Sequence, residues 1–198
     1  AVLDQRIHVG DFRKLADKVP DGSVNLIFTD PPYDRKAEEL FSGLADFASA
    51  KLAEGGSLIM YLGHLQLPSA FIAFSGKLRH WWTCACIHGG GKALMLEYGI
   101  RAGWKPMLWF VKGTRDDKTQ IVFDTVTGDK AKELHDWQQD ESDAAYYIEN
   151  LCPKSGIVCD PFMGSGTTAA AAQKLGRKWI GFEIDPEAAK TASARISL

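Results

Sequence analysis

Two loops in this sequence carry the residue types that chemistry on a small polar group needs. The first is Asp30-Pro31-Pro32-Tyr33, directly after an apolar run that is typical of a buried strand. Its prolines stiffen the loop and lack N–H donors, so the loop carbonyls are left to accept hydrogen bonds. Asp30 adds a carboxylate acceptor, and Tyr33 adds a flat aromatic face. The loop could therefore hold an exocyclic amino group between two acceptors while a ring stacks on Tyr33.

The second loop runs from Asp160 to Thr168, between another apolar run and an alanine-rich helix. Its glycines allow a ligand to approach the backbone at a helix N-terminus. It lacks the Gly-Lys-Ser/Thr of a Walker loop, and Ala169 stands where the third glycine of a dinucleotide loop belongs. Glu183, in the next predicted strand, is placed to bond ribose hydroxyls. A ligand with a carboxylate at the helix N-terminus and a nucleoside at Glu183 has the chemical groups of S-adenosylmethionine.

The elements that would position these loops can be predicted from the sequence pattern. Apolar runs alternate with helical patterns along most of the chain. The alternation predicts an α/β fold with a mostly parallel sheet. The predicted strands are 6–9, 24–30, 57–62, 81–87, 106–112, 157–160 and 178–184. The predicted helices are 35–52, 66–78, 140–151, 166–175 and 186–196. Gly55-Gly56 and Gly176 mark returns from helix to strand. No clear helix separates 81–87 from 106–112, which predicts an antiparallel pair at a sheet edge.

The composition is that of an ordinary globular domain. Of 198 residues, 45% are hydrophobic and 24% are charged, with a formal net charge of -2. These values exclude disorder, collagen and coiled coil, and they predict a single domain over 1–198. No apolar run is long enough to span a bilayer, so no membrane partner is expected. The four cysteines lack metal-ligand spacing, which predicts reduced core thiols, no metal and a cytoplasmic location.

The two loops together resemble a known family. An Asp-Pro-Pro-Tyr loop followed later by Asp-Pro-Phe-x-Gly-Ser-Gly-Thr-Thr is similar to the amino-methyltransferases of DNA, which methylate adenine N6 or cytosine N4. The catalytic loop comes first here, which resembles the permuted beta group, and the resemblance covers nearly the whole chain. It implies a circularly permuted, Rossmann-like fold that uses S-adenosylmethionine. The sheet would have seven strands, with an antiparallel hairpin at one edge.

The resemblance also implies roles for individual residues. The target base would be held by Asp30, Pro31, Pro32 and Tyr33. The implied cofactor-binding residues are Asp11, His135, Asp160, Phe162, Gly164, Ser165, Gly166, Thr167, Thr168 and Glu183. Asp11 would meet the adenine amino group, Glu183 the ribose, and Thr167 and Thr168 the methionine carboxylate. Gln139 and Asp140 replace the usual Lys-Pro of the family, so no role is carried over to position 139.

Contact with DNA is predicted in the segment 88–118, where basic residues outnumber acidic ones in an otherwise acidic chain. The basic residues are Lys92, Arg101, Lys105, Lys112, Arg115 and Lys118. The glycines that follow His88 predict a mobile, DNA-facing loop over 88–105. The polar segment 113–134 has no strong period and is predicted to be a short inserted target-recognition segment.

The sequence thus predicts a site-specific methyltransferase that uses S-adenosylmethionine to methylate the N6 amine of an adenine flipped out of double-stranded DNA. N4 methylation of cytosine on the same fold is the nearest alternative. Methylation of RNA or of a protein glutamine is a second one. A third is an inactive cofactor-binding scaffold that pairs with a catalytic methyltransferase. The short recognition region leaves room for a homodimer or an additional specificity domain.

Overall fold

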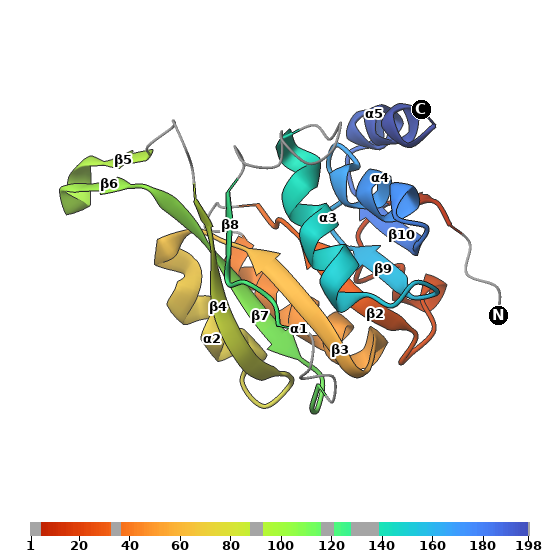
Figure 1. Cartoon of the computed structure of the whole chain (residues 1–198), viewed down its shortest axis with the longest axis horizontal. Helices are drawn as coiled ribbons and strands as arrows, with labels where there is room; N and C mark the ends of the chain where they lie inside the picture. The colour runs from red at the N-terminus through yellow and green to blue at the C-terminus, as the bar shows by residue number, and fades with distance from the viewer. Residues whose placement is uncertain (1–4, 33–36, 88–92, 116–120, 128–138, 198) are drawn as a thin grey trace.

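The structure, a computed structural model, describes residues 5–32, 37–87, 93–115, 121–127 and 139–197. They form an eight-stranded mixed sheet of order β1-β10-β9-β2-β3-β7-β4-β8, and a two-stranded sheet, β5-β6 (Figure 1). The large sheet contains β1 (Ile7–Val9), β2 (Val24–Thr29), β3 (Leu52–Tyr61), β4 (Arg79–Ile87), β7 (Trp104–Val111), β8 (Thr125–Thr127), β9 (Ile157–Asp160) and β10 (Lys178–Glu183). The small sheet contains β5 (Ala93–Met95) and β6 (Ile100–Ala102). The helices are α1 (Ala37–Lys51), α2 (Leu67–Phe74), α3 (Gln139–Leu151), α4 (Thr167–Lys174) and α5 (Pro186–Ile196).

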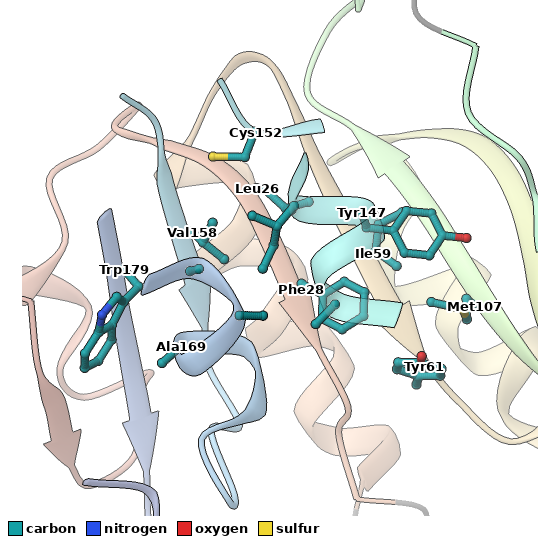
Figure 2. Close-up of a cluster of buried hydrophobic side chains, with 14 of the residues drawn as sticks. Leu26, Phe28, Ile59, Tyr61, Met107, Tyr147, Cys152, Val158, Ala169 and Trp179 are labelled. Carbon is teal, nitrogen blue, oxygen red and sulfur yellow. The ribbon is translucent and has the colours of Figure 1, made fainter. Parts of the chain in front are cut away.

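The large sheet separates two hydrophobic cores. Along β3, Ile59 and Tyr61 enter the first core, while Leu58 and Met60 enter the second, because side chains alternate across a strand. Helices α3, α4 and α5 close the first core, part of which is shown in Figure 2, and α1 and α2 close the second. A strand buried on both faces appears as an unbroken apolar run. The predicted α/β fold with a mostly parallel sheet is confirmed.

The chain leaves the neighbouring strands β2 and β9 in opposite directions across the sheet. After β2 it passes through α1 to β3, and after β9 it passes through α4 to β10 on the other side. The two helices pack into different cores and so cover opposite faces. The carboxyl ends of β2 and β9 therefore form a topological switch point, where open α/β sheets bind ligands. Both predicted loops begin there.

The antiparallel end of the sheet differs from the prediction in its strand count. β4 and β7 pair antiparallel as predicted, with Cys84 opposite Met107. However, β7 lies between β3 and β4, and β8 pairs in parallel with β4. The predicted seven-stranded sheet thus has an eighth strand, which comes from the predicted insertion 113–134. β8 covers the edge of β4 and becomes the edge strand of the sheet, and with three residues it offers few backbone groups for pairing with another chain.

Two further predictions need correction. Within the segment 88–105, which was predicted to be a mobile, DNA-facing loop, β5 and β6 form an antiparallel pair, with Leu94 opposite Arg101. Gly55-Gly56 lies inside β3 rather than before a strand. The strand register shifts opposite this point, between Val24 and Leu26. Gly55 takes a left-handed φ of 76° at this irregularity, which only glycine adopts without strain. Gly176 does stand between α4 and β10, as predicted.

The interior agrees with the composition. All four cysteines, which are Cys84, Cys86, Cys152 and Cys159, are buried, as predicted for core thiols. Among the helices that the structure describes, none has the length and apolar character needed to cross a membrane.

Gly166 is expected to tolerate no side chain, because it begins α4 against α5. Its φ is 82°, and an added Cβ would lie 2.9 Å from Cβ and 3.1 Å from Cα of Ala192. Left-handed strain and overpacking together predict that Gly166→Ala lowers the free energy of unfolding by about 2–4 kcal/mol. Gly176→Ala is the matched control, since its φ is 69° with open space around the added atom; it should cost about 1 kcal/mol. Urea denaturation measures both, and equal losses would contradict the packing argument.

Candidate functional site

A cavity of about 520 Å³ opens at the switch point. The ends of several strands, helix α3 and the glycine-containing loop before α4 enclose it. Its lining residues are Phe28, Thr29, Asp30, Tyr61, Cys86, Lys105, Asp143, Asp160, Phe162, Met163, Gly164, Ser165, Thr167 and Thr168. The two loops predicted from sequence therefore share one cavity. Its volume is in the range of small-molecule sites in proteins.

Asp30 follows the last residue of β2 and reaches the cavity with 49% of its side chain exposed. Its carboxylate accepts hydrogen bonds from Lys105 Nζ, at 2.9 Å to Oδ2 and 3.2 Å to Oδ1. Partial burial raises the pKa of Asp30, while the Lys105 ammonium opposes that rise. Of the rest of the predicted base-binding loop, Pro31 is buried and Pro32 is exposed. Tyr33 lies outside the described residues.

Asp160, at the end of β9, is a buried carboxylate with 4% of its surface exposed. Its Oδ1 accepts from the hydroxyl of Thr29 at 2.6 Å and from the backbone N–H of Phe162 at 3.0 Å. Burial raises the pKa of Asp160 from 3.8 to about 6, although these hydrogen bonds oppose the rise. The nearby charge of Asp30 contributes to the increase. Two carboxylates thus face one cavity from adjacent strands.

The predicted cofactor loop is bound to Glu183 of β10. The Gly164 N–H donates to Glu183 Oε2 at 2.7 Å, and the Asp185 N–H donates to Oε1 at 2.9 Å. Gly164 has a φ of 49°, a left-handed conformation that glycine adopts without strain, two residues before Gly166 caps α4. The loop and the acid that were predicted to bind one ligand are therefore adjacent.

Arg195, near the end of α5, supports this loop and was not predicted from sequence. Its Nη1 donates to Thr167 Oγ1 at 2.7 Å and to Ser165 Oγ at 3.1 Å. The buried carboxylate of Glu141 lies 3.8 Å from Arg195 Nε and also accepts from Lys174 at 2.7 Å. No local sequence pattern marks Arg195, since its role depends on how α5 packs against α3 and α4.

A buried polar group on the other wall of the cavity was also missed. Asp143 Oδ2, from α3, accepts from the Tyr61 hydroxyl at 2.7 Å and from Cys86 Sγ at 3.1 Å. Burial, with the Asp143 charge next, raises the pKa of Cys86 to about 12 and that of Tyr61 well above its ordinary value. Both groups are therefore neutral donors that hold Asp143. The cavity thus contains a third carboxylate.

The comparisons with known proteins agree with this geometry. The pattern of the N6/N4 DNA methylase family matches residues 78–194. The type II methyltransferase M2.LlaDCHI of Lactococcus lactis subsp. cremoris is 32% identical over 96% of this chain and 88% of its own length. M.BamHI of Bacillus amyloliquefaciens is 27% identical over 90% of this chain, which spans only 54% of that protein. This chain belongs to the N6/N4 DNA methylase family.

Solved structures of DNA methyltransferases show the same fold as this chain. The PvuII DNA methyltransferase, which is cytosine-N4-specific, superposes with a TM-score of 0.79 at 18% identity, covering 96% of this chain and 85% of that one. A putative DNA modification methylase of Thermus thermophilus, solved with S-adenosyl-L-methionine, gives a TM-score of 0.74 at 19% identity, covering 98% and 95%. The family resemblance predicted from sequence is thus confirmed, and so is the fold.

Asp11, the predicted contact of the cofactor's adenine, is paired with Arg13. Both of its carboxylate oxygens accept hydrogen bonds from the Arg13 side chain, the shortest at 2.6 Å. This partner lowers the pKa of Asp11. Asp11 does not line the cavity, although the neighbouring Phe12 packs edge-on against Phe162 at 5.1 Å between ring centroids. His135, the other predicted cofactor contact before the main loop, lies outside the described residues.

The basic residues predicted to contact DNA lie at opposite ends of β7. Lys105, at the start of β7, bonds Asp30, whereas Lys112 follows the other end of β7 and donates to the Leu52 carbonyl. About seven residues of strand, at roughly 3.4 Å each, separate these two lysines. Arg115 lies at the Lys112 end, with its guanidinium over Trp109. These residues therefore do not gather at one end of the sheet, and Lys92 and Lys118 lie outside the described residues.

Arg101 belongs to a second cavity of about 590 Å³ beside the first. The β5–β6 hairpin and the turn after β3 form its walls, which include the exposed rings of Tyr98 and Trp104. Lys105 lines both cavities. The apolar and aromatic groove therefore continues directly from the site that contains Asp30.

Replacing Asp160 by asparagine is expected to show what its buried charge costs. Asn keeps Oδ1 as the acceptor for Thr29 and Phe162. Since the pKa rises from 3.8 to about 6, the folded wild type binds more protons in this window and loses up to about 3 kcal/mol of stability as pH increases through it.

The difference in unfolding free energy, Asp160→Asn minus wild type, should accordingly become more positive as pH increases from about 4 to 7. Chemical denaturation of both proteins at a series of pH values measures this difference. A difference that stays constant or falls with pH would show that the carboxylate is not strained by burial.

Proposed function

We propose that this chain transfers a methyl group from S-adenosylmethionine to the exocyclic N6 amine of an adenine that is flipped out of double-stranded DNA. The observation that carries the proposal is the position of Asp30. Its carboxylate, at the end of β2, lies in the same cavity as the glycine-containing loop that follows β9. A proton acceptor for an amine and a binding loop for a nucleoside-containing cofactor are thereby brought together.

The lining of the cavity fits this cofactor. Three carboxylates, those of Asp30, Asp143 and Asp160, line the cavity together with the ammonium of Lys105. This excess of acidic over basic groups favours a ligand with a positive sulfonium and ammonium. We assign the cofactor to Glu183 and to the loop residues Phe162, Gly164, Ser165, Gly166, Thr167 and Thr168. Glu183 would bond the ribose, and the start of α4 would receive the carboxylate. Arg195 would keep the loop hydroxyls in place.

The chain's own contribution to the chemistry is to orient an amine and accept its proton. Asp30 and the Pro31 carbonyl accept the two amino hydrogens, which directs the nitrogen lone pair away from the ring. When bound, S-adenosylmethionine would supply the methyl group for the new N–C bond, and its sulfur would keep the electron pair of the broken C–S bond. The methylated nitrogen then loses one proton, and Asp30 is the base that receives it.

The groove beside the catalytic cavity is the part of the chain that we assign to DNA. A base that is stacked inside a duplex cannot enter the cavity, so the target base has to leave the stack. Arg101 supplies a cation for a phosphate, and the half-exposed ring of Tyr98 supplies a surface for stacking. The short segment 113–134 would add contacts that read sequence.

One observation favours a second candidate, methylation of cytosine N4. The PvuII enzyme, whose fold matches this chain, is described as cytosine-N4-specific. The amino groups of the two bases are chemically similar, and the same pair of acceptors would serve either. Asp30 at the head of the loop leads us to favour adenine.

Asp30→Ala is expected to lower methyl transfer by at least about 10²-fold, because the amine loses its charged acceptor. Unmethylated duplex DNA is incubated with S-adenosylmethionine and each protein, and its nucleosides are quantified by mass spectrometry. Asp46→Ala is the matched control, since Asp46 is also an exposed carboxylate paired with a lysine. Calorimetry should show that both variants still bind S-adenosylmethionine.

N6-methyladenine made by the wild type and the control alone would support the proposal in full. N4-methylcytosine would keep the mechanism and replace the base. A wild-type protein that binds the cofactor but modifies no base in DNA would contradict the proposal and favour RNA or a scaffold role.

Arg101→Ala is expected to weaken binding to duplex DNA and to reduce the slope of log affinity against log salt by about 1. Lys112→Ala and Arg115→Ala remove the same charge at the far end of β7 and should leave the slope unchanged. Fluorescence anisotropy at several salt concentrations measures all three variants. A larger effect from Lys112 or Arg115 than from Arg101 would show that DNA binds at the other end of β7, away from Asp30.

A further inference from the structure

Lys105 occupies an unusual position for a lysine predicted to bind DNA. It is the second residue of β7, and 24% of its side chain is exposed. Its ammonium contacts both oxygens of Asp30 and also lies 4.5 Å from the ring centroid of Tyr61. A cation over an aromatic face is attracted to the ring, so two independent contacts hold the ammonium at the cavity wall.

We infer that Lys105 is a positioning residue for methyl transfer: it holds the Asp30 carboxylate ionised and aimed into the cavity so that it can accept the amino group of the target base. The inference rests on the proposed function. It also reassigns Lys105 from the DNA-binding surface to the reaction centre.

The surroundings of Asp30 explain why such a partner is needed. Asp160 faces it from β9, Asp143 from α3, and the neutral Tyr61 and Cys86 from β3 and β4. Partial burial favours a proton on Asp30, and Asp143 and Asp160 place further carboxylates in the same cavity. Lys105 is the lysine that lines this cavity, and it is already bonded to Asp30. Without it, Asp30 would carry a proton over a wider pH range and would present a donor to the amine.

Lys105 can hold Asp30 without competing with the substrate. A carboxylate has about four lone-pair sites on its two oxygens. The ammonium takes one on each oxygen, as the distances of 2.9 and 3.2 Å indicate. Two bonds from one ammonium do not use the full acceptor capacity of a carboxylate, so Asp30 can accept an amino hydrogen as well. The tyrosine ring below the ammonium keeps the lysine at the wall of the cavity.

The test compares Lys105→Met and Lys105→Arg with wild type by the pH dependence of kcat for DNA methylation. In Lys105→Met the acid limb should move to higher pH by about 1–3 pH units, with kcat falling about tenfold per pH unit below it. Lys105→Arg should restore the limb to within about half a pH unit, because guanidinium keeps the charge. Affinity for S-adenosylmethionine should change less than about threefold, well below the loss of a bound contact.

Lys77→Met is the matched control. Lys77 pairs with Asp46 at 2.6 Å, with 30% of the lysine side chain exposed, and neither residue lines the cavity. It should leave the acid limb in place. A merely structural role for Lys105 would lower stability and kcat at all pH values without moving the limb, and that result would overturn the inference.

A second measurement separates this inference from the proposed function. The carboxyl ¹³C resonance of Asp30, assigned with Asp30→Asn, is followed by NMR against pH in wild type, Lys105→Met and Lys77→Met. A midpoint that increases only in Lys105→Met supports the inference, and equal midpoints overturn it. If the wild type methylates no nucleic acid while the midpoint still increases, the proposed function fails, but the control of Asp30 by Lys105 stands.

Discussion

The hydrogen bond between Thr29 and Asp160 joins the two strands on which the architecture of this protein depends. It is 2.6 Å long, is buried, and connects residues that are 131 positions apart in the chain. Because β2 and β9 are neighbours whose crossovers cover opposite faces, their carboxyl ends form an open crevice. Adjacent strands are only about 4.8 Å apart. The loop that begins at Asp30 and the loop that begins at Asp160 are therefore brought into one cavity.

That proximity has an electrostatic cost. Asp30, Asp143 and Asp160 face one cavity, and burial raises the pKa of both Asp30 and Asp160. The fold offsets this with neutral donors, since the hydroxyls of Thr29 and Tyr61 each bond a carboxylate. Such groups compensate partly, because a hydrogen bond to a charge recovers less than full hydration. Carboxylates whose ionised form is disfavoured by burial often mark a ligand site. A cationic ligand would stabilise their ionised form.

The parts of this structure that sequence predicts well are those set by local pattern. Strands buried on both faces appear as apolar runs, and the glycines before α4 mark a turn that other residues avoid. The eighth strand, Thr125–Thr127, was missed because three polar or β-branched residues gain their identity only from pairing with β4. Arg195 and Asp143 were missed for a related reason: each reaches the site from a helix whose rotation depends on packing. Counting charges in 88–118 found the basic residues but could not show which way each one points.

The direction of β7 explains why those basic residues separate. β7 runs antiparallel to β3, so its first residues lie beside the carboxyl ends of the parallel strands. Trp104 and Lys105 therefore lie at the same end of the sheet as Asp30, whereas Lys112 and Arg115 lie at the opposite end. Any DNA that presents a base to Asp30 must consequently meet the connection that precedes β7, which is the β5–β6 hairpin projecting from the sheet in Figure 1. The β5–β6 hairpin leads directly into the start of β7, so the groove that we assign to DNA and the lysine that we infer to hold Asp30 are adjacent along the chain.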